Sequence, residues 1–485
     1  MKVLFLNPPF ENKKYSRASR SPAVTRSGTL YYPFYLSYAA GVLEQEKGID
    51  VFMIDAIAEG YNEASLIQKI KNISPSLVIC DTSTPSIYND VRICELIKNT
   101  LPHVVVFLVG THPSALPEET LSLSRLIDGI ARKEYDYTIR DIALFLRDGK
   151  DWHQVDGISY RDGMNFVNTK NREFINDLDS LPFVAKVYKQ KLNIYRYFFA
   201  AGRYPMVMMV TGRGCPFQCR WCLYPQTMYG HKYRLRSPEN VFAELEYITK
   251  ELPQVKEIGF EDDTFTADLD RCEKICDLIM KNKLRIRWWA NARADLPLEI
   301  MKKMKSAGCR LLITGFESGS QRILDNVSKK IKIEDSYLFA KNARRVGLLV
   351  HGCFVLGNIG ETKEDILETI NFALSLPIDT AQFFPMIAYP GTYVYQWAVD
   401  NNCLITKDFR KWLTPEGLHA SVIDLPGLQS WEVMQFCNMA RKKFYTRPVY
   451  LLNKIWQSIF SFQEAKRNFK TFSSFKKYVF GKEGK

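Results

Sequence analysis

The chain has 485 residues, of which 46% are hydrophobic and 25% are charged, and its formal net charge is +13. This length and composition are typical of a globular protein of two or three domains and exclude a fibrous or largely disordered chain. The eleven cysteines form an odd number, which argues against a disulfide framework. No signal peptide is recognisable, and the apolar runs are too short to span a membrane. We therefore expect a cytoplasmic protein.

Residues 1–150 alternate short apolar runs with helical patterns, which predicts a doubly wound, Rossmann-like α/β domain with a parallel sheet. Ligands of such sheets bind beyond the carboxyl ends of the strands. The candidate binding residues at these ends are Asn7, Pro8, Pro9, Thr82, Ser83, Thr84, Gly110, Thr111 and His112. The alternative is that they form ordinary turns between strands and helices.

The pattern weakens over residues 151–204, which we interpret as a linker that contains a hairpin with its turn at Asp162-Gly163. Strand–helix alternation returns over residues 205–400, where six candidate strands predict a partial (β/α)6 barrel. In such a barrel the chemistry lies at the carboxyl ends of the strands.

The stretch "GCPFQCRWC" places Cys215, Cys219 and Cys222 in a short loop after the first of these six strands. Three thiolates can hold three irons of a [4Fe-4S] cluster and leave the fourth iron open for another ligand. A structural zinc site needs a fourth ligand, and the next candidate is His231. Three buried structural cysteines are the remaining alternative, but the loop is polar and rich in Gly and Pro. We favour a cluster.

"CPFQCRWC" resembles the CxxxCxxC loop of the radical S-adenosylmethionine (SAM) enzymes, including an aromatic residue, Trp221, before the last cysteine. The resemblance implies that the open iron binds the amino and carboxylate groups of SAM. One electron then cleaves SAM to methionine and a 5′-deoxyadenosyl radical, which takes a hydrogen atom from the substrate. A reductant such as flavodoxin or ferredoxin is the implied source of the electron.

The following strand ends match the family in order. "FEDDTF" is where the family binds the methionine amino group, "ANARADL" provides a partner for its carboxylate, and "TGFESGSQ" resembles the ribose-binding motif. "VLGNIGET" resembles the G-x-P-G-E-T loop near the adenine, although Asn358-Ile359 replaces the usual Leu-Pro. Each acidic residue also has the ordinary alternative of a structural salt bridge. The SAM-binding candidates are Glu261, Asp262, Asp263, Arg293, Glu317, Ser318 and Leu356.

A doubly wound domain before a radical SAM barrel resembles the cobalamin-binding branch of this superfamily. "VGTHPSALPEE" is similar to that branch's G-G-P-H-x-x-x-x-P-E motif but departs from it at Thr111-His112-Pro113. The chain lacks D-x-H-x-x-G, the signature of a histidine that ligates cobalt. The resemblance therefore implies cobalamin without a histidine ligand on its lower face.

From Met1 to about Pro448 the chain most resembles the radical SAM proteins associated with hopanoid biosynthesis, through stretches such as "LNPPF", "LDSLPFV" and "GHKYRLRSPENV". This resemblance implies ring contraction of a glucosamine head group on a hopanoid lipid to a cyclitol ether. A cobalamin-dependent methyltransferase acting on an unactivated carbon uses the same cofactors and stays open as the alternative. A third hypothesis is a structural or sensing protein that holds a cluster without catalysis.

Residues 401–485 are predicted to form a helical, basic and aromatic region. The last 45 residues carry twelve Lys or Arg and two Glu, a net charge of +10. Such a surface suits peripheral contact with the anionic inner face of a membrane. A helical packing region with a solvated basic face is the alternative, and we expect no nucleic-acid partner. In the barrel, Cys353 is a candidate catalytic hydrogen donor, against the simpler interpretation as a small buried side chain.

Overall fold

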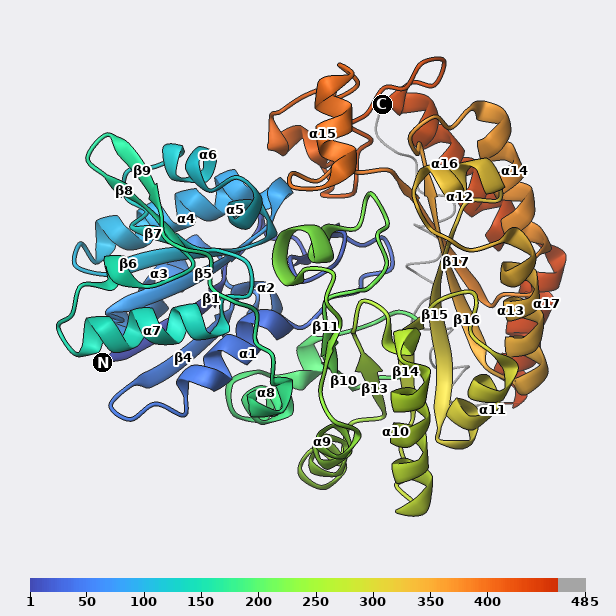
Figure 1. Ribbon diagram of the computed structural model, residues 1–485, viewed down its shortest axis with the longest axis horizontal. Helices are drawn as coiled ribbons and strands as arrows, with labels where there is room; N and C mark the ends of the chain where they lie inside the picture. Colours follow the sequence, from blue (N-terminus) through green and yellow to red (C-terminus); the bar gives the residue numbers. More distant parts are fainter. Residues whose placement is uncertain (461–485) are drawn as a thin grey trace.

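The computed structural model describes residues 1–460, in which two α/β units lie side by side (Figure 1). The sheet of the first unit has the strand order β4-β1-β5-β6-β7-β8-β9. Its first five strands are parallel, and β8 and β9 are antiparallel. The strands are β1 (Lys2–Asn7), β4 (Asp50–Asp55), β5 (Leu77–Thr82), β6 (Val105–Gly110), β7 (Gly129–Ala131), β8 (Ile158–Asp162) and β9 (Asn165–Asn168).

Helices cover both faces of this sheet, as a parallel sheet with buried central strands requires. Every residue of β5 is buried, and β1 is exposed only at its first residue. The helices are α1 (Phe34–Leu43), α2 (Ala56–Glu59), α3 (Glu63–Ile73), α4 (Ile87–Thr100), α5 (Thr111–Ala115), α6 (Pro117–Ser122) and α7 (Asp136–Arg147). The predicted doubly wound domain is confirmed.

The predicted hairpin is also present, but its place differs from the expectation. Strand β8 pairs antiparallel with β7, so the hairpin extends the first sheet instead of lying in a free linker. Helix α8 (Val184–Lys191) follows and contacts α1 of the first unit and β10 (Met206–Met209) of the second unit. The segment 151–204 therefore belongs structurally to the first sheet and to the interface between the units.

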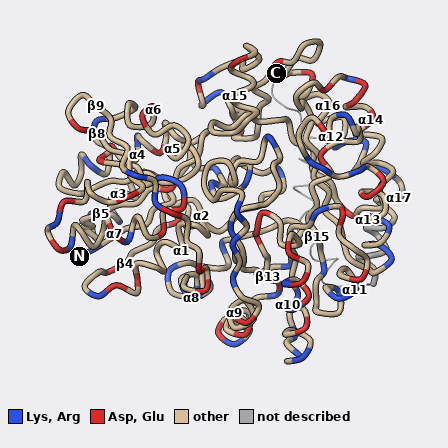
Figure 2. Tube along the Cα trace, viewed as in Figure 1, with Lys and Arg blue, Asp and Glu red and all other residues tan. Residues whose placement is uncertain are grey.

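The second unit is a six-stranded parallel sheet with the order β10-β13-β14-β15-β16-β17, which is the predicted partial barrel. The strands are β10 (Met206–Met209), β13 (Glu257–Phe260), β14 (Trp288–Ala292), β15 (Cys309–Glu317), β16 (Leu349–Leu356) and β17 (Thr380–Pro385). The helices on its outer side are α9 (Pro238–Glu251), α10 (Leu269–Lys281), α11 (Leu298–Ser306), α12 (Gln321–Asn326), α13 (Ile333–Val346) and α14 (Lys363–Ser375). Figure 2 shows both signs of charge along α9 and α10.

Local sequence explains where several of these helices begin. The Asn62 side chain accepts a hydrogen bond from the Ser65 backbone N–H at the start of α3. Ser237 caps α9 in the same way, with Pro238 in the first turn. These side chains satisfy N–H groups that have no partner within the helix.

The region after the barrel is helical only in part. Helix α15 (Tyr393–Asp400) is followed by an irregular stretch, residues 401–429, which contains the short 3-10 helix η7 (Phe409–Trp412) and isolated β-bridges. Helices α16 (Ser430–Tyr445) and α17 (Pro448–Phe460) come next. The predicted helical region therefore begins at Ser430 rather than at residue 401, because the Pro- and Gly-containing stretch before it does not favour a helix.

Most of the basic tail, residues 461–485, lies outside the described residues. In α17 four large apolar side chains are exposed: Leu451, Leu452, Trp456 and Ile459. No helix within residues 1–460 is long and apolar enough to cross a membrane. Peripheral membrane contact through this region stays a prediction.

Buried ion pairs join the two units. The Arg213 guanidinium, on the short strand β11 (Gly212–Arg213), donates to Glu134 at 2.8 Å and to Asp136 at 2.7 Å. Arg234, on the paired strand β12 (Arg234–Leu235), also donates to Glu134 at 2.6 Å. Because β11 leads directly into the cysteine loop, these contacts fix that loop relative to the first unit.

Candidate active site

The cysteine loop leaves β11 through Gly214, whose backbone has a φ of 81°. A Cβ atom at this position would lie 2.3 Å from the Lys232 carbonyl oxygen, so only glycine fits. The backbone N–H of Cys215 then donates to the Gly230 carbonyl at 3.3 Å. The close approach of these two segments places Cys215 at the carboxyl edge of the barrel sheet.

Gln226 holds the rest of the loop. Its amide nitrogen lies 3.4, 3.2 and 2.8 Å from the carbonyl oxygens of Cys219, Arg220 and Cys222. Its amide oxygen accepts from the backbone N–H of Tyr393 at 2.8 Å, at the start of α15. Gln226 was not among the predicted site residues, although a glutamine four residues after the last cysteine is a usable signal.

All three loop cysteines are free thiols; Cys215 is buried, and Cys219 and Cys222 are half-buried. Burial raises the pKa of the Cys222 thiol, and the charges of Asp263, Cys219 and Cys215 raise it further. Burial also raises the pKa of Cys219, while Lys329 and Arg293 act in the opposite direction. The three sulfurs are therefore close enough to interact, beside two cations that favour thiolates.

The donor set fits a cluster better than a single zinc ion. Within residues 1–460, no three His, Cys, Asp or Glu side chains converge in the way that ligands of one ion do. His231 lies with Nδ1 3.2 Å from the Cys215 carbonyl oxygen and 3.1 Å from that of Phe217, so this nitrogen binds the backbone. Three thiols spread along one loop match a cluster whose irons each take one of them. Cys215, Cys219 and Cys222 are thus suited to hold the [4Fe-4S] cluster.

The Trp221 side chain is half-buried and packs against the core. Its indole Nε1 is buried without a hydrogen-bond partner within the described residues. A buried donor without a partner carries a free-energy cost, which a bound acceptor removes. Its predicted contact with a cofactor remains a prediction.

The acidic residues after β13 already have a cation. Arg20, from the first unit, donates through Nη2 to the backbone carbonyls of Glu261 at 2.6 Å and Asp262 at 2.8 Å. It also pairs with the carboxylates of Glu261 at 3.3 Å and Asp263 at 3.2 Å. The carbonyls and carboxylates predicted for an ammonium group are thus well placed for a cation. SAM can bind them only if Arg20 shares or releases them.

Asp262 differs from its two neighbours. Its carboxylate is fully buried and accepts from the Thr211 backbone N–H at 2.5 Å and from the Thr211 hydroxyl at 2.6 Å. Burial raises its pKa, and Arg271 together with the Thr211 hydrogen bonds lowers it. These contacts tie the end of β10 to β13, just before the cysteine loop.

Arg293 and Glu317 lie beside Cys219. The Arg293 guanidinium stacks 3.7 Å from the ring centroid of Phe217 in the cysteine loop and donates to the Lys329 carbonyl at 3.3 Å. Glu317, in a left-handed backbone conformation with φ of 65°, pairs with the Lys329 ammonium at 2.7 Å. Lys329 was missed by the sequence analysis, because nothing in its local sequence indicates a site.

Ser318 and Leu356 are both fully buried. The Ser318 hydroxyl lies 3.0 Å from that of Thr369 and accepts from the Ser320 backbone N–H at 3.1 Å. Leu356 ends β16, directly before the loop in which Glu361 accepts from the backbone N–H of Asn358 at 2.8 Å. Contact of Ser318 and Leu356 with SAM stays a prediction.

Cys353 lies on β16, on the same face as His351, and its register partner on β17 is Gln382. Burial raises the pKa of its thiol to about 12, so the thiol keeps its proton at neutral pH. The charges of Glu317, Lys329 and Arg20 act on this thiol as well. Cys353 therefore lies near the charged residues Glu317, Lys329 and Arg20, which surround the carboxyl ends of the strands.

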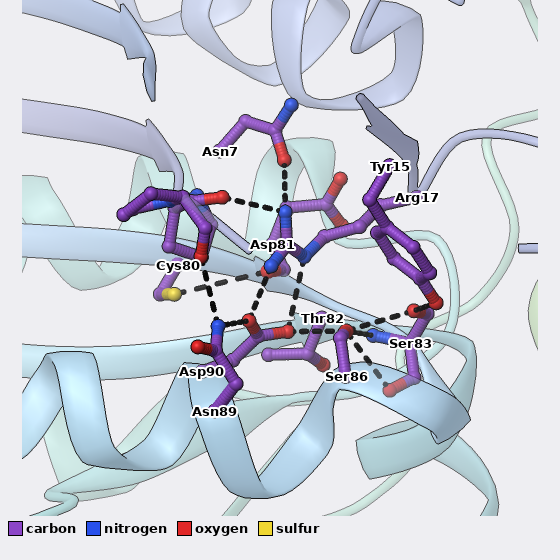
Figure 3. A network of polar contacts seen from close by, with 12 residues as sticks. Asn7, Tyr15, Arg17, Cys80, Asp81, Thr82, Ser83, Ser86, Asn89 and Asp90 are labelled. Carbon is purple, nitrogen blue, oxygen red and sulfur yellow. Dashed lines mark hydrogen bonds and ion pairs between the residues drawn. The ribbon is translucent and has the colours of Figure 1, made fainter. Parts of the chain in front are cut away.

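Two of the predicted residues at the carboxyl edge of the first sheet, Asn7 and Pro8, contact Arg17 (Figure 3). Arg17 and Asp90 form a buried ion pair, and the guanidinium also donates to the Asn7 side chain at 2.8 Å and to the Pro8 carbonyl at 2.7 Å. The Ser83 hydroxyl lies 2.7 Å from that of Tyr15. The segment that contains Tyr15 and Arg17 thus covers the crevice between β1 and β5.

The other residues of this edge also have internal partners. The Pro9 carbonyl accepts from the Asn89 side chain at 2.8 Å, and the Thr82 hydroxyl donates to the Val109 carbonyl at 2.8 Å. Gly110 has a φ of 116°, and a Cβ there would lie 2.2 Å from the Thr82 carbonyl oxygen. Only glycine fits at position 110, because β6 pairs closely with β5 there.

Thr111 and His112 begin α5 and are buried. His112 Nδ1 lies 3.3 Å from the Thr84 hydroxyl, whereas its Nε2 is buried without a partner within the described residues. Burial lowers the pKa of His112 to about 3, so the imidazole is neutral. The ring of Phe409, from the stretch 401–429, lies edge-on 4.8 Å away. Contact of Thr111 and His112 with cobalamin stays a prediction.

Comparisons with known proteins agree with this geometry. Residues 209–373 match the model of the radical SAM superfamily, and residues 20–143 match the B12 binding domain. A protein of Pyrococcus horikoshii named as an uncharacterized methyltransferase is 32% identical over 94% of this chain and 95% of its own length. The anaerobic magnesium-protoporphyrin IX monomethyl ester cyclase of Rubrivivax gelatinosus is 26% identical over 82% of this chain and 70% of its own.

Among solved structures, the radical SAM methyltransferase TsrM from Kitasatospora setae superposes with a TM-score of 0.68 at 16% identity. The match covers 90% of this chain and 88% of that one, which shows a shared fold. The fold and the site define a B12-binding radical SAM enzyme. This chain belongs to the radical SAM superfamily, in the same family as the Pyrococcus relative, and uses a [4Fe-4S] cluster, SAM and cobalamin.

Proposed function

We propose that this enzyme is a cobalamin-dependent radical SAM methyltransferase that acts on an unactivated carbon. The observation that carries the proposal is the relative named as a methyltransferase, which matches this chain over 94% of its length, both units included. The TsrM structure supports it through the shared two-unit fold. When bound, the cluster with SAM supplies a carbon-centred radical, and cobalamin supplies the methyl group.

Residues of both units contribute to the cofactor sites. Gln226 and Gly214 fix the cysteine loop at the strand ends, and Arg213 anchors it to the first unit. Arg293 and Lys329 place positive charge next to Cys219. His112 and Phe409 lie at the carboxyl edge of the first sheet, which faces the same interface. The protein thus positions both cofactor sites with buried, pre-formed contacts, which lowers the cost of ordering them on binding.

Ring contraction of a hopanoid head group, which the sequence resemblance implied, is the competing reaction. Two of the three proteins named above favour methyl transfer over it, because the Pyrococcus protein and TsrM carry methyltransferase names, whereas the Rubrivivax relative is named as a cyclase. The two reactions need the same cofactors and differ in the mass of the product. A methyl transfer adds one methyl group, whereas a ring contraction adds none.

The test is anaerobic reconstitution with iron, sulfide, cobalamin and SAM carrying a trideuterated methyl group. Extracts of membranes and of soluble metabolites serve as substrate sources, and Cys219→Ala is the control variant. A product that carries the trideuterated methyl group supports the proposal. A rearranged product without it supports ring contraction instead, and the absence of any SAM-derived cleavage product points to the non-enzymatic hypothesis.

We propose separately that Cys353 serves the competing ring contraction, in which the rearranged substrate radical takes a hydrogen atom from its thiol, whereas methyl transfer leaves no substrate radical to quench. The thiyl radical left on Cys353 then takes an electron from the reductant and a proton from solvent. The Cys353 thiol is protonated and lies on the face of β16 that contains His351. Cys353→Ser keeps the size but replaces a weak S–H bond with a strong O–H bond, so turnover should fall about tenfold or more. Cys353→Ala that retains full activity would exclude this role. SAM cleavage measured without product formation separates a lost donor from a lost fold.

A further inference from the structure

The interior of the half-barrel contains a chamber of about 240 Å³. Its walls are β15, β16 and β17, residues 199–201 and 418–419, parts of α16 and α17, and part of the segment 19–31. The half-buried residues of β16 and β17 alternate along each strand, which places them on the face towards the interior. These residues are Leu349, His351, Cys353, Thr380, Gln382 and Phe384.

Two histidines are among the polar side chains that line the chamber. His351 Nδ1 lies 2.8 Å from the Thr380 hydroxyl, and its Nε2 lies 3.4 Å from the Gln382 amide oxygen. His419 Nε2 lies 2.9 Å from the Ser21 hydroxyl. The other nitrogen of His419, Nδ1, is buried and has no hydrogen-bond partner within the described residues. It is therefore a group that a ligand can satisfy.

The charged side chains that line the chamber, Arg26, Asp379 and Arg441, already have partners. Burial lowers the pKa of both His351 and His419 to about 4, so both rings are neutral at pH 7. The Asp379 carboxylate accepts from the Val350 backbone N–H at 2.9 Å. Arg441 donates to the Phe383 carbonyl and the Asn438 side chain, and the charge of Arg26 acts on Glu416. An ionic ligand would lose its hydration here and would have to compete with these partners for a counter-charge.

Apolar side chains make up most of the remaining wall, among them Tyr31, Phe199, Leu349 and Phe384. A volume of about 240 Å³ is slightly below that of ordinary ligand pockets, at about 300–1,000 Å³. A cavity of about 150 Å³ lined by apolar side chains already takes up benzene. The chamber therefore has room for one substituted ring.

On β15 and β16 the chamber is lined by Leu311, Leu349 and His351, which precede Cys353 and the carboxyl edge. Cys353 follows His351 by two residues along β16, in the direction of the carboxyl edge. Arg20 and Lys329 influence the Cys353 thiol and lie beside the cysteine loop. A ligand in the chamber is thus separated from that edge by the layer that contains Cys353.

We propose that this chamber binds an uncharged, mostly apolar ring compound, or the ring end of a larger one, with a hydrogen-bond donor directed at His419 Nδ1. With the Nε2 proton of His419 donated to Ser21, Nδ1 is an acceptor. The inference rests on the proposed function in one respect, since it describes the substrate class of that site. Binding is measured without turnover, so it can succeed or fail independently of methyl transfer.

The probes are four compounds built on one benzene ring: phenol, toluene, benzoate and benzylamine. Binding to the reconstituted protein, with cluster and cobalamin but without SAM, is measured by ligand-detected NMR titration at pH 7. Phenol should bind about fivefold more tightly than toluene because of one hydrogen bond. Benzoate and benzylamine, which are charged at this pH, should not bind measurably.

Two variants and one control assign the effect to the chamber. His419→Phe should abolish the preference for phenol while toluene still binds. Ala200→Phe, on the wall, should abolish binding of both, whereas Leu367→Phe on the exposed side of α14 should change neither. Binding of benzoate or benzylamine as tight as that of phenol overturns the proposal. So does the absence of saturable phenol binding, or phenol preference that persists in a folded His419→Phe protein.

Discussion

The two sheets of this enzyme both end in polar residues, but they use them differently. At the edge of the first sheet, Arg17 gathers Asp90, Asn7 and the Pro8 carbonyl into a closed network. At the edge of the second sheet, Arg20 gathers the carbonyls and carboxylates that follow β13, while three thiols remain free beside them. Two arginines three residues apart therefore bind the polar groups of two different sheet edges.

The difference concerns solvent as well as partners. Both members of the Arg17–Asp90 pair are at most 1% exposed, whereas the Arg20 side chain is 33% exposed. A fully buried pair is costly to break, because the remaining charge has no water and no partner. The first edge is thus built for rigidity, and the second keeps groups that a cofactor can reach.

The largest effect is expected at the second edge. Cys219→Ala removes one of three thiols that can hold the cluster, so the protein should bind far less iron and SAM cleavage should fall to background. Iron and sulfide analysis and quantification of 5′-deoxyadenosine measure this. Cys403→Ala, a free cysteine in the stretch 401–429, should leave both unchanged. Normal iron content in Cys219→Ala would remove this cysteine from the cluster.

The next effect tests the rigidity of the first edge. Arg17→Met leaves Asp90 buried without its partner and should lower the free energy of unfolding by about 3–5 kcal/mol. Arg92→Met breaks a pair with Glu63 in which both side chains are about half exposed, and should cost less than about 1 kcal/mol. Urea unfolding compares the two variants. Equal losses would show that burial does not distinguish the pairs.

The two edges also contain carboxyl groups that should make stability depend on pH. Burial raises the pKa of Asp81, in β5, to about 7 and that of Glu361, after β16, to about 8. Both values lie above those of the unfolded chain, so the folded state binds more protons. Stability should therefore fall as the pH rises from about 5 through 8.

Asp81→Asn and Glu361→Gln should each flatten this dependence. Glu361→Gln is the sharper variant, since its amide oxygen can still accept from the Asn358 backbone N–H. Denaturant midpoints at several pH values give the slope, and Glu299→Gln, at an exposed site on α11, is the control. A slope equal to that of the unaltered protein in both variants would contradict the raised pKa values.

The smallest effect concerns Arg20 itself. Because its guanidinium uses the acceptors expected for the SAM ammonium, Arg20→Gln should tighten SAM binding by about tenfold, or about 1.4 kcal/mol. Isothermal titration calorimetry of the cluster-loaded protein measures the affinity. Arg196→Gln, on a distant surface turn, is the control. Weaker SAM binding in Arg20→Gln would show that the guanidinium helps to hold SAM.

The strands and their carboxyl ends were predictable because they depend on local patterns. Six strands of the barrel, the hairpin at Asp162-Gly163 and the cap at Asn62 follow from residues close together in the sequence. Arg20 and Glu261 are 241 residues apart, and no local pattern pairs them. Gln226 and Lys329 were missed for a related reason, since an isolated polar residue has no signature before the fold is known. The irregular stretch 401–429 was expected to be helical, although its isolated bridges depend on distant pairing.

The ion pairs of Arg213 and Arg234 with the first unit affect any attempt to express the second unit alone. A fragment that begins at residue 205 would keep these buried guanidinium groups but lose Glu134 and Asp136. It would also keep Glu261 and Asp263 without Arg20. Such a fragment would place several unmatched charges in its interior. The catalytic barrel of this enzyme is therefore not a portable module, and the two units must be expressed, evolved and engineered together.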